Sequence, residues 1–327
     1  MKIGIVGTGM IVGMIAPHLA DWDIQVTAIA GTPRSVDTME RMANEYGAGG
    51  RYTDWHDLLA DDGVDTVYVA APNFLHYEIS KAALEAGKDV ICEKPLTSAY
   101  DEAAELATLA EERGRMLWEA VVTTRQPNFA NIRRMLPRVG TIKVVTVNYS
   151  QYSSRYDAFR EGTVLPAFDP AKAGGALMDL GLYTLTFTLG LFGEPVSARY
   201  LPNVERDIDT SGIALLSYDG FTAVNVCAKD SGAPCYAIIQ GTDGYIRMDS
   251  APNACGAVTL HLNDGTEEFV DDRLPVMWEA EFKEFRRQQD EGDFDECRRQ
   301  LRESLLVNRI QNDIRREAGI RFPTDPA

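Results

Sequence analysis

The chain has 327 residues, of which 45% are hydrophobic and 25% charged, a composition that is typical of a soluble globular protein. Its 32 Lys and Arg residues against 49 Asp and Glu residues give a formal net charge of −17. A chain this acidic is not expected to bind nucleic acid or an anionic membrane, because both require a basic face. The length indicates two domains, each large enough to bury a core.

The cysteine content indicates a reducing compartment. The five cysteines are widely spaced and form no C-x-x-C pair, which favours neither a disulfide framework nor a zinc site. The chain opens directly as a strand, so we expect no signal peptide. The most apolar stretch, 177–192, is short for a membrane span and carries Asp179, which predicts a buried helix instead. We therefore expect a cytoplasmic protein, without a bound metal.

Strands and helices alternate up to about residue 122. Strands are predicted at 3–6, 25–30, 64–70, 89–92 and 116–121, and helices at about 10–21, 35–46, 76–86 and 99–113. Gly87 and Gly114 follow two of these helices, where a C-cap glycine is expected. Because helices of this length separate the strands, residues 1–122 are predicted to form an α/β domain, a doubly wound parallel sheet covered on both faces.

Beyond residue 122 the strands follow one another with short turns. A helix at 127–136, a strand at 141–150 and a helix at 176–191 precede strand-like runs at 196–204, 212–218, 221–228, 235–241, 244–249, 257–262 and 266–270. This pattern predicts a large, mostly antiparallel open sheet. Helices at 278–291 and 297–318 complete an α+β domain over residues 123–327.

The first strand runs into a glycine turn and a helix, as in dinucleotide-binding proteins. Gly7 permits a tight turn, and Gly9 lets the backbone approach a pyrophosphate at the helix N-terminus. The third position of the fingerprint is Val12 rather than Gly or Ala. The position of the turn inside a βαβ unit nevertheless favours dinucleotide binding over a purely structural turn. The residues expected at the dinucleotide are Gly7, Thr8, Gly9, Met10 and Ile11.

The end of the second strand indicates which dinucleotide is bound. The segment after Ala30 has no acidic residue to bind the ribose 2′-hydroxyl of NAD. Thr32 and Arg34 instead supply a hydroxyl and a guanidinium, which suit a 2′-phosphate. NADP(H) is therefore favoured over NAD(H), with a solvated loop arginine as the alternative interpretation of Arg34.

Two further motifs carry a family resemblance. The first joins Ala71-Pro72-Asn73-Phe74-Leu75-His76 to Glu93-Lys94-Pro95, and the second is Gly174-Gly175-Ala176-Leu177-Met178-Asp179-Leu180-Gly181-Leu182-Tyr183. With the Gly7-Thr8-Gly9 turn, they make nearly the whole chain resemble the Gfo/Idh/MocA oxidoreductases. The resemblance implies a dinucleotide-binding Rossmann domain followed by a domain for substrate binding and oligomerisation. It also implies hydride transfer between a nicotinamide cofactor and a sugar, polyol or related alcohol or carbonyl substrate.

The resemblance assigns catalysis to Lys94, Tyr183 and Asp179. Lys94 follows a parallel strand at its carboxyl end, where ligands bind in doubly wound sheets. A lysine there can hydrogen-bond the substrate oxygen and favour the phenolate of Tyr183, whose ordinary pKa is about 10. Asp179 lies four residues before Tyr183, on the same helix face, and would bind substrate hydroxyls or orient the acid/base. The competing interpretation makes Asp179 a first-turn charge partner and Tyr183 a core anchor.

The cofactor-binding residues implied by the resemblance also include Ala71, Asn73, His76, Glu93 and Lys94, and Pro95 is expected to be cis. The alternative role of His76 is to cap the following helix.

Several further charged residues have two interpretations each. Glu119 and Arg125 match positions near the active site of relatives, or else form a buried ion pair. Arg155, Arg160 and Lys172 either meet an anionic or hydroxylated substrate or are solvated loop charges.

Two alternative functions remain open. One is a trans-dihydrodiol-type dehydrogenase or carbonyl reductase that acts on apolar substrates. The other is a non-catalytic, NAD(P)-responsive regulatory protein of the same fold, although a pure sensor needs none of Lys94, Asp179 and Tyr183. The expected partners are a small-molecule substrate and, through the sheet of the second domain, further copies of the chain in a homodimer or higher homo-oligomer.

Overall fold

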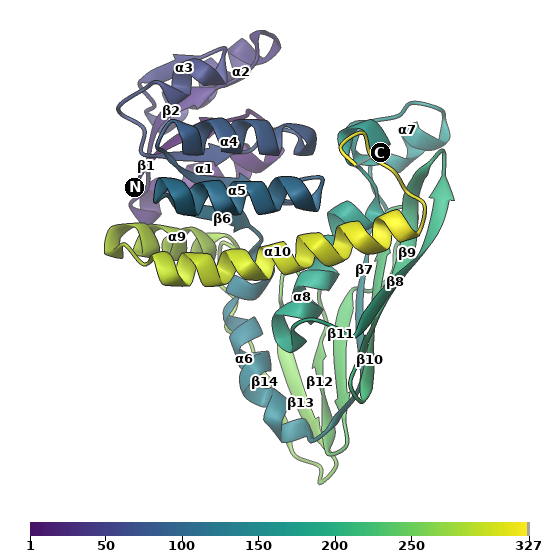
Figure 1. The fold of residues 1–327 in the computed structure, drawn as a ribbon. Coiled ribbons are helices and arrows are strands. Elements are labelled where there is room, and N and C mark those ends of the chain that lie inside the picture. Colours follow the sequence, from purple (N-terminus) through teal and green to yellow (C-terminus); the bar gives the residue numbers. More distant parts are fainter. Residues whose placement is uncertain (326–327) are drawn as a thin grey trace. The chain divides into compact units, whose positions relative to one another are not determined.

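The computed structural model describes residues 1–325 and divides the chain into two compact units (Figure 1). Unit 1 consists of Met1–Ala120 and Glu281–Leu305, and unit 2 consists of Val121–Ala280 and the residues from Leu306 onward. The division differs from the expected one in two respects: the first segment of unit 1 ends at Ala120 rather than at residue 122, and residues 281–305 were expected in the second domain.

Unit 1 is built on a six-stranded parallel sheet in the order β3-β2-β1-β4-β5-β6. This is the strand order of the Rossmann fold, as predicted. Its elements are β1 Lys2–Val6, α1 Met10–Leu19, β2 Gln25–Ala30, α2 Val36–Tyr46, β3 Gly50–Tyr52, α3 Trp55–Leu59, β4 Thr66–Val69, α4 His76–Glu85, β5 Asp89–Glu93, α5 Tyr100–Arg113 and β6 Leu117–Ala120.

The core of unit 1 explains why 281–305 belong to it. On one face of the sheet, Val67 and Val69 pack with apolar side chains of α3, α4 and α5. Tyr68 points to the other face, where its ring lies 5.6 Å from Phe282 of α9 (Glu279–Glu291). Trp118 of β6 likewise packs against Phe285, with ring centroids 5.4 Å apart. Burying these aromatic rings attaches α9 to the sheet as one of its covering helices.

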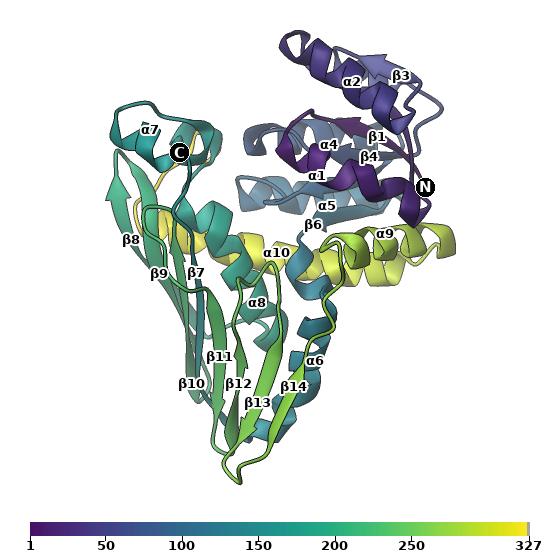
Figure 2. The same cartoon turned by 180° about the vertical axis from the view of Figure 1, so that it is seen from behind.

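Unit 2 is built on an eight-stranded sheet in the order β14-β13-β12-β11-β7-β10-β9-β8, of which β7 and β10 pair in parallel and all other neighbours pair antiparallel. Figure 2 shows β11 to β14 side by side. The elements are α6 Pro127–Met135, β7 Ile142–Ser150, α7 Tyr156–Arg160, α8 Leu182–Phe192, β8 Ser197–Glu205, β9 Ile208–Tyr218, β10 Phe221–Ala228, β11 Tyr236–Gly241, β12 Gly244–Met248, β13 Val258–Leu262 and β14 Glu267–Val270. The helix α10, Phe294–Glu317, contributes its first twelve residues to unit 1 and the rest to unit 2.

One face of the eight-stranded sheet forms the core of unit 2. Alternate residues such as Val145 and Val147 are buried against α6, α8 and the second part of α10, and Phe129 packs edge-on to Phe187 at 5.7 Å. The segment Pro170–Phe192 is long and apolar enough to cross a membrane by length and composition alone, but 72% of its most apolar window is buried inside the protein. The predicted buried helix is therefore the central covering helix of this sheet.

Candidate active site

The Gly7-Thr8-Gly9 turn lies between the end of β1 and the start of α1, at the carboxyl edge of the sheet. Gly7 has φ +128°, and a Cβ atom there would lie 2.3 Å from the carbonyl oxygen of Ala70, so only glycine fits. Gly9 is the N-cap of α1, which has no side-chain cap, and no atom lies within 4 Å of where its Cβ would be. The N-terminus of α1 thus has no side-chain cap and open space beside Gly9, which suits a pyrophosphate.

The loop after β2 carries the residues expected at a 2′-phosphate, Thr32 and Arg34, and beside them a further hydroxyl, that of Ser35. The Ser35 hydroxyl lies 2.9 Å from the Thr32 N–H, which donates to it, and the Ser35 N–H donates to the Thr32 carbonyl at 2.9 Å. This reciprocal turn groups two hydroxyls beside Arg34, whose exposed side chain has no partner among residues 1–325. The T-x-x-S spacing resembles a capping box and was the available signal for Ser35.

His76 joins the loops that follow β4 and β5. Its ring is 1% exposed, with Nδ1 2.8 Å from the Pro95 carbonyl oxygen and Nε2 2.8 Å from the Ala71 carbonyl oxygen. Burial lowers the pKa of His76 by more than the two carbonyl contacts raise it. The capping alternative is wrong, because α4 has no side-chain cap. The buried ring therefore links the loop after β4 to the loop after β5.

The segment that carries Lys94 is held by buried contacts on both sides. The Lys94–Pro95 peptide bond is cis, as expected. The Tyr68 hydroxyl donates to Glu93 Oε1 at 2.6 Å, and the Leu96 N–H donates to Glu119 Oε1 at 2.8 Å. Burial raises the pKa of both carboxyl groups, Glu93 and Glu119. Glu119 therefore fastens the backbone just after Lys94.

In unit 2, the glycine-rich motif forms a π-helical turn rather than a regular helix start. The turn covers Leu177–Gly181 and continues into α8. Its N-terminal N–H, on Leu177, donates to Asp209 Oδ2 at 2.6 Å, and the Tyr200 hydroxyl donates to the same oxygen at 2.8 Å. Gly175 has φ +108°, and a Cβ there would lie 2.2 Å from Asp209 Oδ1. Gly175 is thus required for this buried carboxylate to reach the turn, and burial raises the pKa of Asp209.

Asp179 lies within the π-helical turn and is paired with a lysine that sequence reasoning missed. Lys229, directly after β10, donates from Nζ to Asp179 Oδ2 at 2.8 Å. The lysine side chain is 4% exposed and that of Asp179 39% exposed. Their fifty-residue separation leaves no spacing rule that connects them. The available signal was a lysine at the end of an apolar strand.

Tyr183 lies in the first turn of α8, half-buried, with its ring 5.9 Å from that of Tyr149. Arg155 and Arg160 are exposed, and Lys172 is half-buried. The Arg160 guanidinium lies 3.8 Å from Asp157, which fits a solvated surface pair.

Within each unit the predicted residues come together. In unit 1, the residues after β1, β4 and β5 gather at the carboxyl edge of three neighbouring strands: Gly7, Thr8, Gly9, Ala71, Asn73, Glu93 and Lys94. In unit 2, Asp179 and Tyr183 share one helical segment. No group of three His, Cys, Asp or Glu residues within 1–325 has the arrangement of a metal site.

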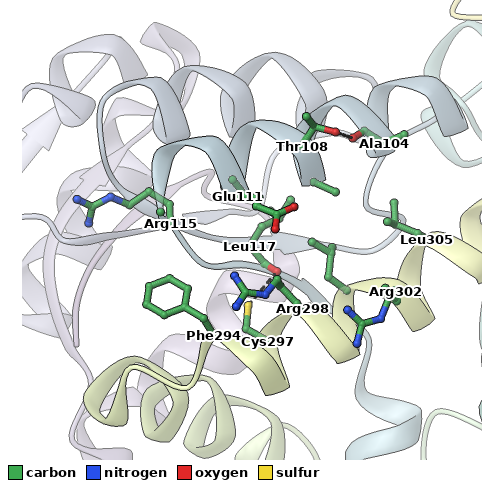
Figure 3. A pocket seen from close by; sticks show the side chains of 14 residues that line it. Ala104, Thr108, Glu111, Arg115, Leu117, Phe294, Cys297, Arg298, Arg302 and Leu305 are labelled. Atoms are coloured by element: carbon green, nitrogen blue, oxygen red, sulfur yellow. Dashed lines mark hydrogen bonds between the residues drawn. The ribbon is translucent and has the colours of Figure 1, made fainter.

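A separate cavity of about 350 Å³ lies in unit 1 between α5 and the first part of α10 (Figure 3). Its walls include Leu117, the first residue of β6, and Arg115 just before it. The cavity therefore lies toward the amino ends of the strands, away from the edge where doubly wound sheets bind ligands.

Comparison with known proteins agrees with these two units. Residues 1–121 match the model of an oxidoreductase family with an NAD-binding Rossmann fold, and residues 129–247 match the GFO/IDH/MocA C-terminal domain. The chain is 35% identical to the NADP(+)-dependent scyllo-inositol 2-dehydrogenase IolU of Bacillus subtilis, over 100% of both chains. It is 27% identical to mouse trans-1,2-dihydrobenzene-1,2-diol dehydrogenase, over 99% of both. A 3-ketoreductase from Actinomadura kijaniata in complex with NADP and TDP-benzene has a similar structure, with TM-score 0.84, 25% identity and 97% of each chain covered.

Proposed function

Because this chain belongs to the Gfo/Idh/MocA oxidoreductase family, we propose that it transfers a hydride between NADP(H) and a hydroxyl-bearing carbon of a sugar or polyol. The observation that carries the proposal is the Lys94 segment, which buried contacts hold at the same sheet edge as the Gly7–Gly9 turn. A relative identical at 35% over the whole chain is an NADP(+)-dependent inositol dehydrogenase, which supports both the cofactor and the substrate class.

The residues present fit a dinucleotide phosphate. The uncapped N-terminus of α1 and the open space at Gly9 would hold the pyrophosphate. Arg34 and the hydroxyls of Thr32 and Ser35 would hold the 2′-phosphate, at a loop that has no carboxylate to repel it. When bound, the nicotinamide accepts a hydride from an alcohol carbon or returns one to a carbonyl carbon.

The proton transfer that accompanies this hydride transfer is assigned to Tyr183, with Lys94 assisting. When an alcohol is oxidised, its carbon loses a hydride and its oxygen loses a proton, which the Tyr183 phenolate takes up. The Lys94 ammonium is assigned a hydrogen bond to the substrate oxygen, which stabilises the negative charge that develops there. Asp179 accepts a hydrogen bond from a neighbouring substrate hydroxyl. In the reverse direction, Tyr183 returns the proton to the nascent alkoxide.

The first experiment is a titration of the purified protein with NADPH and NADH, followed by nicotinamide fluorescence, and then NADP(+)-dependent oxidation of scyllo-inositol and other polyols. We expect tighter binding of NADPH than of NADH and turnover of at least one polyol. Binding of neither dinucleotide would contradict the proposal. Tight NADPH binding without turnover of any alcohol or carbonyl would favour the regulatory alternative.

A second candidate is supported by the similarity to the mouse dihydrodiol dehydrogenase. This candidate predicts that trans-1,2-dihydrobenzene-1,2-diol is oxidised with a higher kcat/KM than any polyol. Comparing the two substrate classes with the same preparation decides between them.

We also propose that the protein is cytoplasmic and forms a homodimer through the outer face of the eight-stranded sheet. That face carries partly exposed apolar side chains on five strands: Val144, Leu201, Ile213, Tyr245 and Phe269. Apolar patches of this kind mark protein interfaces. Sedimentation at micromolar concentration should give twice the 36.1 kDa chain mass or a higher multiple. A mass near that of one chain would contradict the proposal. If the wild-type protein is an oligomer, Phe269→Asp should lower its mass toward that of one chain.

A further inference from the structure

Lys229 is a buried cation outside every motif named above. Its Nζ donates to Asp179 Oδ2 at 2.8 Å and to the Ala167 carbonyl oxygen at 3.2 Å, and it lies 5.0 Å from the centre of the Phe168 ring. The side chain is 4% exposed. Removing an ammonium group from water is costly unless a negative charge and further acceptors surround it. Asp179 supplies that charge.

The two side chains of this pair differ in exposure. In another ion pair with a deeply buried cation, Arg315 with Asp325, both side chains are nearly inaccessible. In the Lys229–Asp179 pair the cation is equally buried, but 39% of the carboxylate side chain remains accessible. The lysine therefore holds one oxygen of a carboxylate that solvent, or a ligand, can still reach.

The backbone around Asp179 is fixed independently of this pair. The π-helical turn Leu177–Gly181 is fastened at its start by Asp209, and such turns are frequent at functional sites. With the main chain set, the remaining freedom of Asp179 is the rotation of its side chain. The charge-assisted hydrogen bond from Lys229 restricts that rotation.

We propose that Lys229 is a positioning residue of the active site, which orients the Asp179 carboxylate and aims it at a hydroxyl of the substrate. This role rests on the proposed function, and it indicates which substrates the enzyme would prefer. An ionised carboxylate only accepts hydrogen bonds, so the substrate must present a hydroxyl that donates to it, in addition to the one that is oxidised. Lys229 thereby selects polyhydroxylated substrates over simple alcohols.

The test is a double-mutant cycle on the full-length protein with Lys229→Met, Asp179→Asn and the double variant. The substrate is the polyol that the wild-type protein oxidises with the highest kcat/KM. We expect Lys229→Met to raise KM about 10-fold or more, because a displaced Asp179 carboxylate binds substrate poorly. We expect a smaller change in kcat and no change in NADPH affinity. The double variant should match Asp179→Asn alone, since Lys229 acts through that carboxylate. Lys229→Arg should restore most of the wild-type KM.

The matched control is Lys143→Met, which removes an exposed lysine from β7 of the same unit and should change neither KM nor kcat. If Lys229→Met does not fold, Lys229→Gln gives the same comparison with a neutral donor in place of the charge. Additive effects of the two substitutions, or an unchanged KM in the Lys229 variant, would overturn the positioning role in an active enzyme. A wild-type protein that oxidises no polyol would instead contradict the proposed function, and the positioning role with it.

Discussion

The two units hold their functional side chains by different means. In unit 1, contacts to main-chain atoms hold the segment of Lys94: the His76 ring meets the Pro95 carbonyl oxygen, and the Glu119 carboxylate accepts from the Leu96 N–H. In unit 2, the contact is made to the functional side chain itself, because the Lys229 ammonium donates to the Asp179 carboxylate.

This difference separates position from charge. Main-chain contacts fix the position of the backbone at Lys94, and they do not depend on the side chain of that residue. Substitution of Lys94 should therefore leave the surrounding loops in place. A side-chain contact with a charged group also restricts the rotamer of Asp179. Unit 2 is therefore expected to be the more sensitive to the loss of one remote partner, and unit 1 to the loss of the functional residue alone.

The largest expected effect comes from the two residues assigned to proton transfer. Lys94→Ala and Tyr183→Phe should each lower kcat/KM by about 10²–10⁴-fold, the usual contribution of a positioned acid/base group. Tyr183→Phe should leave NADPH affinity unchanged. Steady-state kinetics and NADPH titration check these outcomes. Wild-type turnover in either variant would remove that residue from the mechanism.

The sequence predicted most of the fold because the hydrophobic pattern repeats clearly in long elements. It missed β3 and α3, which have three and five residues and are too short to show a period. It found the helix at 279–291 but placed it in the second domain. That assignment depends on Phe282 and Phe285 reaching aromatic side chains far away in the sequence, which no local pattern shows.

The candidate site was predictable where motif and chemistry coincide, as at Gly7, Lys94 and the Asp179–Tyr183 segment. The π-helical turn was not, because its five residues are too few for the hydrogen-bond period to leave a trace in the sequence pattern. Lys229 was missed for another reason. Its pairing is created by the sheet, which brings the end of β10 beside a turn fifty residues earlier.

A smaller effect is expected at the loop after β2 in unit 1, where the exposed guanidinium of Arg34 is the charged group proposed to contact the 2′-phosphate. Arg34→Ala should weaken NADPH binding about 10-fold or more and leave NADH binding unchanged, because a charge-assisted hydrogen bond to a phosphate contributes roughly 1.5–3 kcal/mol. Arg41→Ala is the matched control, since this exposed arginine of α2 pairs with Glu45 instead. Dinucleotide titrations check the prediction, and equal weakening for both dinucleotides would show that Arg34 does not contact the 2′-phosphate.

The smallest expected effect is the pH dependence of the stability that His76 contributes to unit 1. Burial, with Lys94 nearby, lowers the pKa of His76 below its ordinary value of about 6.5. Below that pH the unfolded chain binds a proton on His76 that the folded protein does not, so this group's contribution to stability is present above about pH 6.5 and is lost as the pH falls. His76→Gln cannot titrate, and all other groups contribute alike to both proteins. The difference in unfolding free energy between wild type and variant, measured by urea denaturation, should therefore shrink from pH 8 to pH 5.

A difference that grows on acidification would mean that His76 is an imidazolium in the folded state, donating to both carbonyl oxygens. Unit 1 would then depend on a buried charge just as unit 2 does, and the contrast between main-chain and charge anchoring would fail.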